Sequence, residues 1–172
     1  MLLRFNLSSV PSTFPLARAE LRLFALGERM EIQRVSHTIY VARFLKPWNE
    51  GRGVGDDGQA AQKGEVTFNS ARHGVDRWEK PGAVGLTDVA DWESSATVGE
   101  NYPEWVAFDV TQSVREFLRM PSLNHGWKIS QDSTRGHDDA TITYSMGLYT
   151  YKSSEAPQPE LCPMLVLIPR EK

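Results

Sequence analysis

Apolar side chains at every second position recur in short segments along the chain, and this pattern constrains the fold most strongly. Such a period places the apolar side chains on one face of a β-strand and the polar ones on the other. We therefore predict half-buried strands over residues 3–7, 19–23 and 105–110. Residues 38–45 are rich in β-branched and aromatic side chains and are predicted to form another strand, which stops before Pro47.

Further short strands are predicted over residues 127–129, 141–144 and 148–151. The last apolar segment, residues 164–168, has no polar side chain on either face. A strand of this kind is typical of the middle of a sheet that is covered on both sides. We therefore expect it there and not at an exposed edge.

One segment, residues 111–120, has the spacing of an amphipathic helix. Its apolar side chains recur three and four positions apart, Thr111 is available as the N-cap, and Pro121 ends the run. Many short strands with one short helix predict an all-β fold, an antiparallel two-sheet β-sandwich of jelly-roll or related Greek-key topology. The helix is expected to plug one end of this sandwich.

Length and charge exclude several classes of protein. The chain has 172 residues, 40% of them hydrophobic, which suits a single domain over residues 1–172. Its net charge of −3 lacks the basic excess of nucleic-acid binders, and no apolar run is long enough for membrane insertion. Arg4 interrupts the start of the chain too early for a signal peptide. The single cysteine, Cys162, excludes an internal disulfide and is expected to be a small buried residue.

Residues 46–104 do not share the alternating pattern. They extend for about sixty residues, whereas ordinary connections have ~4–6. Trp48, Trp78 and Trp92 lie in this stretch, and such side chains are costly to leave in water. We expect a long Trp-bearing loop insertion that folds as a cover, with a loose glycine-rich tip near residues 51–64.

The usual catalytic patterns are absent from the sequence, so we predict no enzyme and no cofactor. The four histidines form no metal-binding pair, no serine lies in a G-x-S-x-G turn, and the glycine-rich stretch lacks the Lys-Ser/Thr of a phosphate-binding loop. Two distant carboxylates such as Glu50 and Asp109 can be paired as in a glycosidase, but the sequence does not give their separation. Asp132, Asp138 and Asp139 are weak candidates for a structural calcium site, since their spacing is not that of an EF-hand.

Four further residues are predicted to have structural roles. Asp109 and Thr111 lie where a strand passes into the helix, and their oxygens can accept hydrogen bonds from free N–H groups of the first helical turn. Asn124 and Gly126 flank His125 in a turn, because Asn and Gly tolerate a positive φ.

Several ordered segments resemble those of DNRLRE-domain proteins. The resemblance rests on eight segments, namely residues 2–7, 19–23, 47–50, 78–82, 108–111 with Val114, 124–128, 153–156 and 163–165. It implies a β-sandwich module of secreted microbial proteins, related to alginate-type carbohydrate-binding modules and without catalytic residues. Members of that family carry one or two more strands before the segment at residues 2–7, so the resemblance also implies that N-terminal strands are missing here.

Two hypotheses about function follow, both with an extracellular or cell-surface location implied by the resemblance. In the first, the module binds polysaccharide or cell-surface glycan through exposed aromatic rings and through cations that pair with uronate carboxylates. The candidate residues are Trp48, Trp78, Trp92, Tyr102, Trp105, Arg52, Arg72, Arg77 and Lys80. In the second, it is a structural subunit of a surface assembly or filament, in which neighbouring copies add a strand to its sheet edge.

Overall fold

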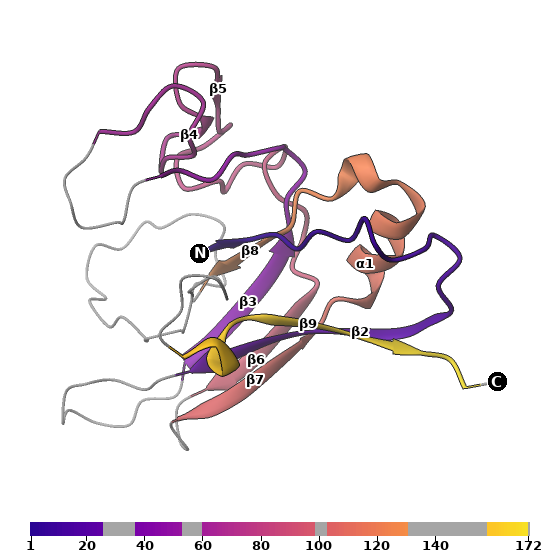
Figure 1. Cartoon of the computed structure of the whole chain (residues 1–172). Coiled ribbons are helices and arrows are strands. Elements are labelled where there is room, and N and C mark those ends of the chain that lie inside the picture. Colours follow the sequence, from indigo (N-terminus) through magenta and orange to yellow (C-terminus); the bar gives the residue numbers. More distant parts are fainter. Residues whose placement is uncertain (26–36, 53–59, 99–102, 131–157, 172) are drawn as a thin grey trace.

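The computed structural model describes residues 1–25, 37–52, 60–98, 103–130 and 158–171. Within these ranges the chain forms two antiparallel sheets, one α-helix and a small hairpin (Figure 1). The strands are β1 (Leu2–Leu3), β2 (Leu16–Ala25), β3 (His37–Arg43), β4 (Ser70–Arg72), β5 (Asp76–Arg77), β6 (Ser94–Val98), β7 (Glu104–Asp109), β8 (Trp127–Ser130) and β9 (Met164–Pro169). The helix is α1 (Thr111–Arg119), and two 3-10 turns are η1 (Pro121–Leu123) and η2 (Pro159–Leu161).

The two sheets form a sandwich. One has the strand order β1-β8-β3-β6 and the other the order β7-β2-β9, and every strand pair in them is antiparallel. The register places Leu21 opposite Phe108 in one sheet and Val41 opposite Ile129 in the other. The predicted all-β sandwich with one short helix is therefore confirmed.

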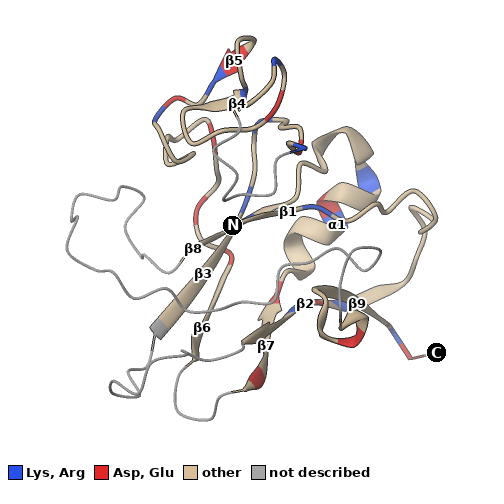
Figure 2. Cartoon of the chain, turned by 60° about the vertical axis from the view of Figure 1, so that its left-hand side comes forward, with Lys and Arg blue, Asp and Glu red and all other residues tan. Residues whose placement is uncertain are grey.

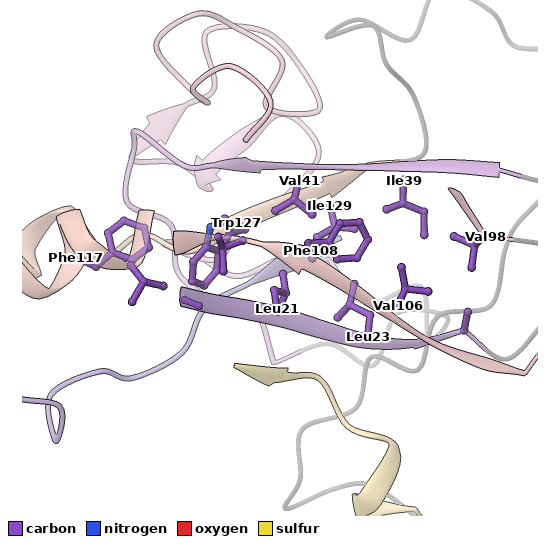
Figure 3. Close-up of a cluster of buried hydrophobic side chains, with 14 of the residues drawn as sticks. Leu21, Leu23, Ile39, Val41, Val98, Val106, Phe108, Phe117, Trp127 and Ile129 are labelled. Carbon is purple, nitrogen blue, oxygen red and sulfur yellow. The ribbon is translucent and has the colours of Figure 1, made fainter. Parts of the chain in front are cut away.

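The main core lies between the two sheets. Figure 3 shows Leu21 and Leu23 of β2 on one side of it and Ile39 and Val41 of β3 on the other, with Phe108 of β7 between them. These five side chains are almost completely buried. Burying each of them contributes about 1.5–3 kcal/mol, so the alternating pattern of the strands translates directly into stability.

Helix α1 closes one end of the sandwich, as predicted. Val114, Phe117 and Leu118 belong to the main core, and the Phe117 ring lies 5.3 Å from that of Trp127. Thr111 is not the N-cap, because the capping position is Val110, which offers no side-chain acceptor. Instead, the backbone N–H of Ser113 donates to Oε1 of Glu93 at 2.8 Å, so a residue distant in sequence satisfies the first turn.

The N-terminal strand is shorter than predicted. The expected strand over residues 3–7 is limited to β1, because its partner β8 begins at Trp127, which pairs with Leu3. Beyond Leu3 no described strand continues the ladder. Phe5 and Leu7 nevertheless pack against the main core, so the alternation correctly indicated their burial but not their hydrogen bonding.

Strand β6 was not predicted. It pairs with β3 over its whole length, from Val41 opposite Ser94 to His37 opposite Val98. Its sequence is dominated by small polar residues, and only Val98 is fully buried. Such a segment has no apolar period to reveal it, so the predicted insertion over residues 46–104 includes a strand of the sandwich.

The rest of the insertion that the structure describes, residues 46–52 and 60–93, folds over one end of the four-stranded sheet and is called the cover here. It contains the hairpin β4–β5, and its Trp48 and Trp78 form a second hydrophobic cluster with Phe44, which follows β3. Lys128 of β8 links the two regions, since its Nζ donates to the carbonyl oxygens of Gly82 at 2.9 Å and Ala83 at 3.2 Å.

Some predicted features lie outside the described residues. These are the strands over residues 141–144 and 148–151 and part of the glycine-rich tip, residues 53–59. Beside that tip the cover is hydrogen-bonded, with the Gly64 N–H donating to His73 O at 2.8 Å. Among the described residues, no helix is long and apolar enough to cross a membrane.

Candidate partner-binding surface

The three-stranded sheet has an apolar surface on the side away from the core, which we call the outer face. The alternation of β2 creates it, because Ala19, Leu21 and Leu23 point into the core and the intervening residues point outward. The outward side chains come from three strands. They are Arg18, Glu20, Arg22 and Phe24 of β2, Trp105, Ala107 and Asp109 of β7, and Met164, Val166 and Ile168 of β9.

The charged residues of the outer face neutralise one another. Glu20 accepts from Arg22 at 2.7 Å and lies 3.2 Å from Arg18, whose Nε is 3.5 Å from Asp109. Hydrogen bonds from Thr111 hold the pKa of the Asp109 carboxyl below its usual value, and the charges of Arg18 and Arg115 act in the same direction. Glu20 is buried, but its arginine partners and Asp109 are open to water. Solvent-screened pairs contribute ~0–1 kcal/mol each, so their main effect is to leave a face with little net charge.

The apolar residues of the outer face remain partly in water. Trp105 is 40% exposed and its ring makes an edge-on contact with Phe24 at 5.2 Å. Met164 and Ile168 lie on β9 and are 38% and 37% exposed. A group of exposed aromatic and aliphatic side chains on one face is typical of a protein interaction site.

Strand β9 borders this face and lies at an edge of its sheet among the described strands. It pairs with β2 on one side, from Leu16 opposite Pro169 to Arg22 opposite Met164. The predicted central position stays a prediction, because residues 131–157 lie outside the described part of the chain, within which β2 is the neighbour of β9. Leu165 and Leu167 face the core, while the other side chains of β9 form part of the outer face.

A groove between the N-terminal segment and helix α1 is a second concave feature. It has a volume of about 580 Å³. Its lining includes Phe5, Asn6, Ser8, Phe117 and Asn124. The Asn124 side chain donates to Phe5 O at 2.9 Å, while its Oδ1 is buried without a partner in the described part of the chain.

Two of the predicted sugar-binding tryptophans are buried in the cover. Trp48 is 6% exposed and Trp78 is 5% exposed, and both rings pack against Phe44. Their indole N–H groups donate to His125 O at 2.8 Å and to Thr67 O at 3.0 Å. These rings hold the cover together and present no flat face to a ligand.

The other aromatic candidates are scattered. Trp92 is half-buried against Tyr40, with the ring centres 5.4 Å apart. Tyr102 lies outside the described residues, and Trp105 belongs to the outer face.

The cationic candidates lie on the cover and serve its local structure. Arg72 lies 3.5 Å from Asp76, while the backbone N–H groups of Arg52 and Lys80 donate to Glu65 and Asp88. The Arg77 carbonyl accepts a hydrogen bond from Lys46 at 2.7 Å. Figure 2 shows acidic as well as basic residues on the hairpin β4–β5, so these cations do not form a separate basic patch.

The residues predicted to have structural roles occupy two turns. Asp109 Oδ1 accepts from the Thr111 N–H at 3.0 Å, whereas the Thr111 hydroxyl accepts from the Ala19 N–H of β2 at 2.9 Å. Gly126 has φ +76°, and a Cβ at this position would lie 2.1 Å from the Leu3 carbonyl oxygen. Both the left-handed backbone and the close approach of β1 therefore require glycine here.

The calcium candidates Asp132, Asp138 and Asp139 lie outside the described residues. Within the described residues, no group of three or more His, Cys, Asp or Glu side chains is arranged to hold a metal ion.

The feature that sequence reasoning missed is the outer face. Phe24 and Met164 were not among the candidates, although Phe24 directly follows the predicted strand over residues 19–23 and Met164 begins the one over residues 164–168. The pattern of residues 164–168 could have indicated the outer face, because apolar residues on both sides of a strand predict that both of its faces are covered. The fold is that of a β-sandwich module, and the outer face is its candidate binding surface.

A comparison with known protein families identifies the family of this chain. The sequence matches the TGF-beta propeptide family over residues 1–167, and the chain therefore belongs to that family. A comparison with curated proteins found no match.

The family corrects several predictions. The DNRLRE resemblance was wrong, and with it the polysaccharide-binding module, the filament subunit and the glycan partner, because the family is the propeptide of growth-factor precursors. TGF-beta propeptides are non-enzymatic and are secreted, in agreement with the prediction of no enzyme and of an extracellular location at the level of the family.

Proposed function

We propose that this chain is a non-enzymatic propeptide module that binds a mature growth-factor domain through the outer face of the sheet β7-β2-β9. The observation that carries the proposal is the membership of residues 1–167 in the TGF-beta propeptide family. The outer face adds a location, since it groups Phe24, Trp105 and Met164 on adjacent strands.

The chemistry of the outer face suits a protein partner. Trp105 can bury a large area on binding, and aromatic residues of this kind dominate the energetics of protein interfaces. The pairs of Glu20 with Arg18 and Arg22 remain satisfied when water leaves the face, which limits the cost of desolvation. Among the described strands β9 has one neighbour, β2, so an extended segment of the partner can pair with the other side of β9.

Binding to purified TGF-beta-family growth factors tests the function. The 172-residue chain is mixed with each mature growth factor of a panel, and complex formation is followed by size-exclusion chromatography with light scattering. A propeptide of the same family with a known growth-factor partner is the positive control. The proposal predicts a stable complex with at least one growth factor, and it is contradicted if the control binds its partner while this chain binds none of the panel.

Hydrogen exchange of the complex tests the location. We expect slower amide exchange in β9 and β7 on binding, since these strands form the outer face. Protection confined to the cover would contradict the assigned surface while leaving growth-factor binding itself intact.

A further inference from the structure

A pocket at one end of the sheet β7-β2-β9 is lined by three arginines. It has a volume of about 270 Å³ and lies between helix α1, the turn before β2 and the end of β9. Two of its arginines, Arg115 and Arg119, belong to α1, and the third, Arg170, follows β9. No acidic side chain of the described part of the chain lines it. We call this feature the arginine pocket.

Two hydrogen bonds fix the walls of the arginine pocket. The backbone N–H of Arg170 donates to Pro15 O at 2.7 Å, which ties the end of β9 to the segment before β2. The Nη2 of Arg115 donates to Ala17 O at 2.9 Å, which ties α1 to the start of β2. The guanidinium group of Arg115 has five N–H donors in all, so others remain for a ligand.

The positive charge of the arginine pocket is not balanced within the described residues. Arg115 and Arg119 are four positions apart on α1, and like charges at this spacing destabilise a helix. Arg115 interacts with the charge of Asp109, but the guanidinium groups of Arg119 and Arg170 form no ion pair or hydrogen bond within the described ranges. The C-terminal end of α1 favours a cation at Arg119, whereas Arg170 lies outside the helix. An anion in the pocket relieves the repulsion among these groups.

Apolar side chains line the arginine pocket beneath the exposed arginines. Leu16 and Leu118 are buried, Phe14 is half-buried, and all three line the pocket together with Pro15. A water molecule takes about 30 Å³ in the liquid, so the volume suits one large side chain and not an extended segment. The pocket therefore fits a group that has an apolar body and an anionic end.

We propose that the arginine pocket binds a sulfated or phosphorylated tyrosine side chain of a protein partner. The two modifications share one chemistry, an aromatic ring that carries a negatively charged group with three terminal oxygens. Guanidinium groups donate paired hydrogen bonds to such oxygens, and the ring covers the apolar side chains of the pocket. A carboxylate of Asp or Glu has two oxygens and no ring, so it uses less of the pocket. The site does not depend on the assignment of the growth factor to the outer face.

Titration of labelled peptides with the 172-residue chain at low salt tests the site. Fluorescence anisotropy compares four peptides of one sequence, whose central residue is sulfotyrosine, phosphotyrosine, glutamate or tyrosine. We expect sulfotyrosine or phosphotyrosine to bind at least about tenfold more tightly than the other two, and the tighter of this pair identifies the modification. Inorganic sulfate and phosphate should compete at least about tenfold more weakly than the modified peptides, because they lack the ring. Equal binding of the glutamate peptide, or equal competition by the inorganic ions, would overturn the proposal.

Arginine variants place the binding in the pocket. Arg119→Ala and Arg170→Ala each remove one guanidinium group and are each expected to weaken binding of the preferred peptide about tenfold or more. Arg77→Ala is the control, because it removes the same charge from an exposed position on the cover and should leave the affinity unchanged. Circular dichroism verifies folding, and Arg170→Ala decides if Arg119→Ala disturbs α1. Equal weakening by Arg77→Ala and Arg170→Ala would overturn the proposal, since general charge attraction would then account for the binding.

Discussion

The main core and the cover are both built around aromatic residues, but different forces hold them. In the main core, Phe108 and Trp127 are carried by strands whose ladders fix their positions. In the cover, where few residues belong to strands or helices, the hydrogen bond from the Trp78 indole N–H to the Thr67 carbonyl oxygen holds this ring in its cluster. The difference teaches that repeated apolar spacing builds the sandwich, whereas single polar side chains build the cover.

Asp88 is a single polar side chain that organises the cover. Its carboxylate is completely buried and accepts the backbone N–H groups of Glu79 at 2.8 Å, Lys80 at 3.2 Å and Gly85 at 3.0 Å. The Nζ of Lys46 lies 3.8 Å away. One side chain therefore satisfies three donors that a regular element would satisfy through its backbone.

The largest expected effect belongs to the main core. Phe108→Ala removes a fully buried ring between the sheets and is expected to lower the free energy of unfolding by about 3–5 kcal/mol. Urea denaturation followed by circular dichroism measures this change. The control Phe68→Ala lies in the cover, where the ring is 69% exposed, and is expected to change stability by less than about 0.5 kcal/mol. Equal effects of the two substitutions would contradict the assigned core.

A glycine substitution at the junction of β1 and β8 comes next. Gly126→Ala is expected to cost ~1–2 kcal/mol for the left-handed backbone and a further ~1–3 kcal/mol for the overlap with Leu3. Gly64→Ala in the cover is the matched control, since its φ is +94° but nothing lies within 4 Å of the added Cβ. It should show only the backbone cost. Thermal unfolding of both variants provides the comparison, and a smaller loss at Gly126 than at Gly64 would refute the close approach of β1.

A smaller and more local effect is expected in the cover. Asp88→Asn replaces one acceptor oxygen with a donor and should cost about 1–3 kcal/mol, because buried N–H groups lose a charged partner. Hydrogen exchange should become faster at Glu79, Lys80 and Gly85 and remain unchanged in β2 and β7. Uniformly faster exchange throughout the sandwich would show that the cover and the main core unfold as one unit.

The smallest effect concerns pH. Desolvation lowers the pKa of His125 from 6.5, and the nearby charge of Arg4 acts in the same direction. Because the unfolded chain takes up the proton first, stability should fall as the pH decreases through 6.5 and should level off below the folded-state pKa. His125→Gln should flatten this part of the stability profile. If the stability of the His125→Gln variant depends on pH as steeply as that of the unmodified chain, His125 is not the source of this pH dependence.

The sequence predicted the elements whose side chains alternate or follow a helical period. Strands β2, β7 and β9 and helix α1 each bury one regular set of apolar residues, so their existence could be inferred from spacing alone. Strand β6 could not, because its small polar residues are held by backbone pairing with β3. Neighbour relations between strands, such as the position of β2 between β7 and β9, are not encoded in periodicity.

The site and the family were predicted less well than the fold. Residues 108–111 and 124–128 resemble segments of DNRLRE proteins, yet their physical roles occur in β-sandwiches of many families. Asp109 accepts a hydrogen bond where a strand passes into a helix, and Gly126 allows a left-handed turn before a strand. Unrelated sandwiches need the same residues at such points, so short segments of this kind do not distinguish families.

The affinity of outer-face variants for a growth factor that forms the complex tests the central claim most directly. Trp105→Ser removes the largest exposed side chain of the outer face, and Leu86→Ser is the control, because Leu86 is 72% exposed on the cover. Circular dichroism verifies that both variants are folded. We predict that Trp105→Ser weakens binding at least about tenfold, equivalent to ~1.4 kcal/mol, while Leu86→Ser leaves the affinity unchanged. Unchanged affinity of the Trp105 variant together with weaker binding of the Leu86 variant would contradict the account and place the partner on the cover.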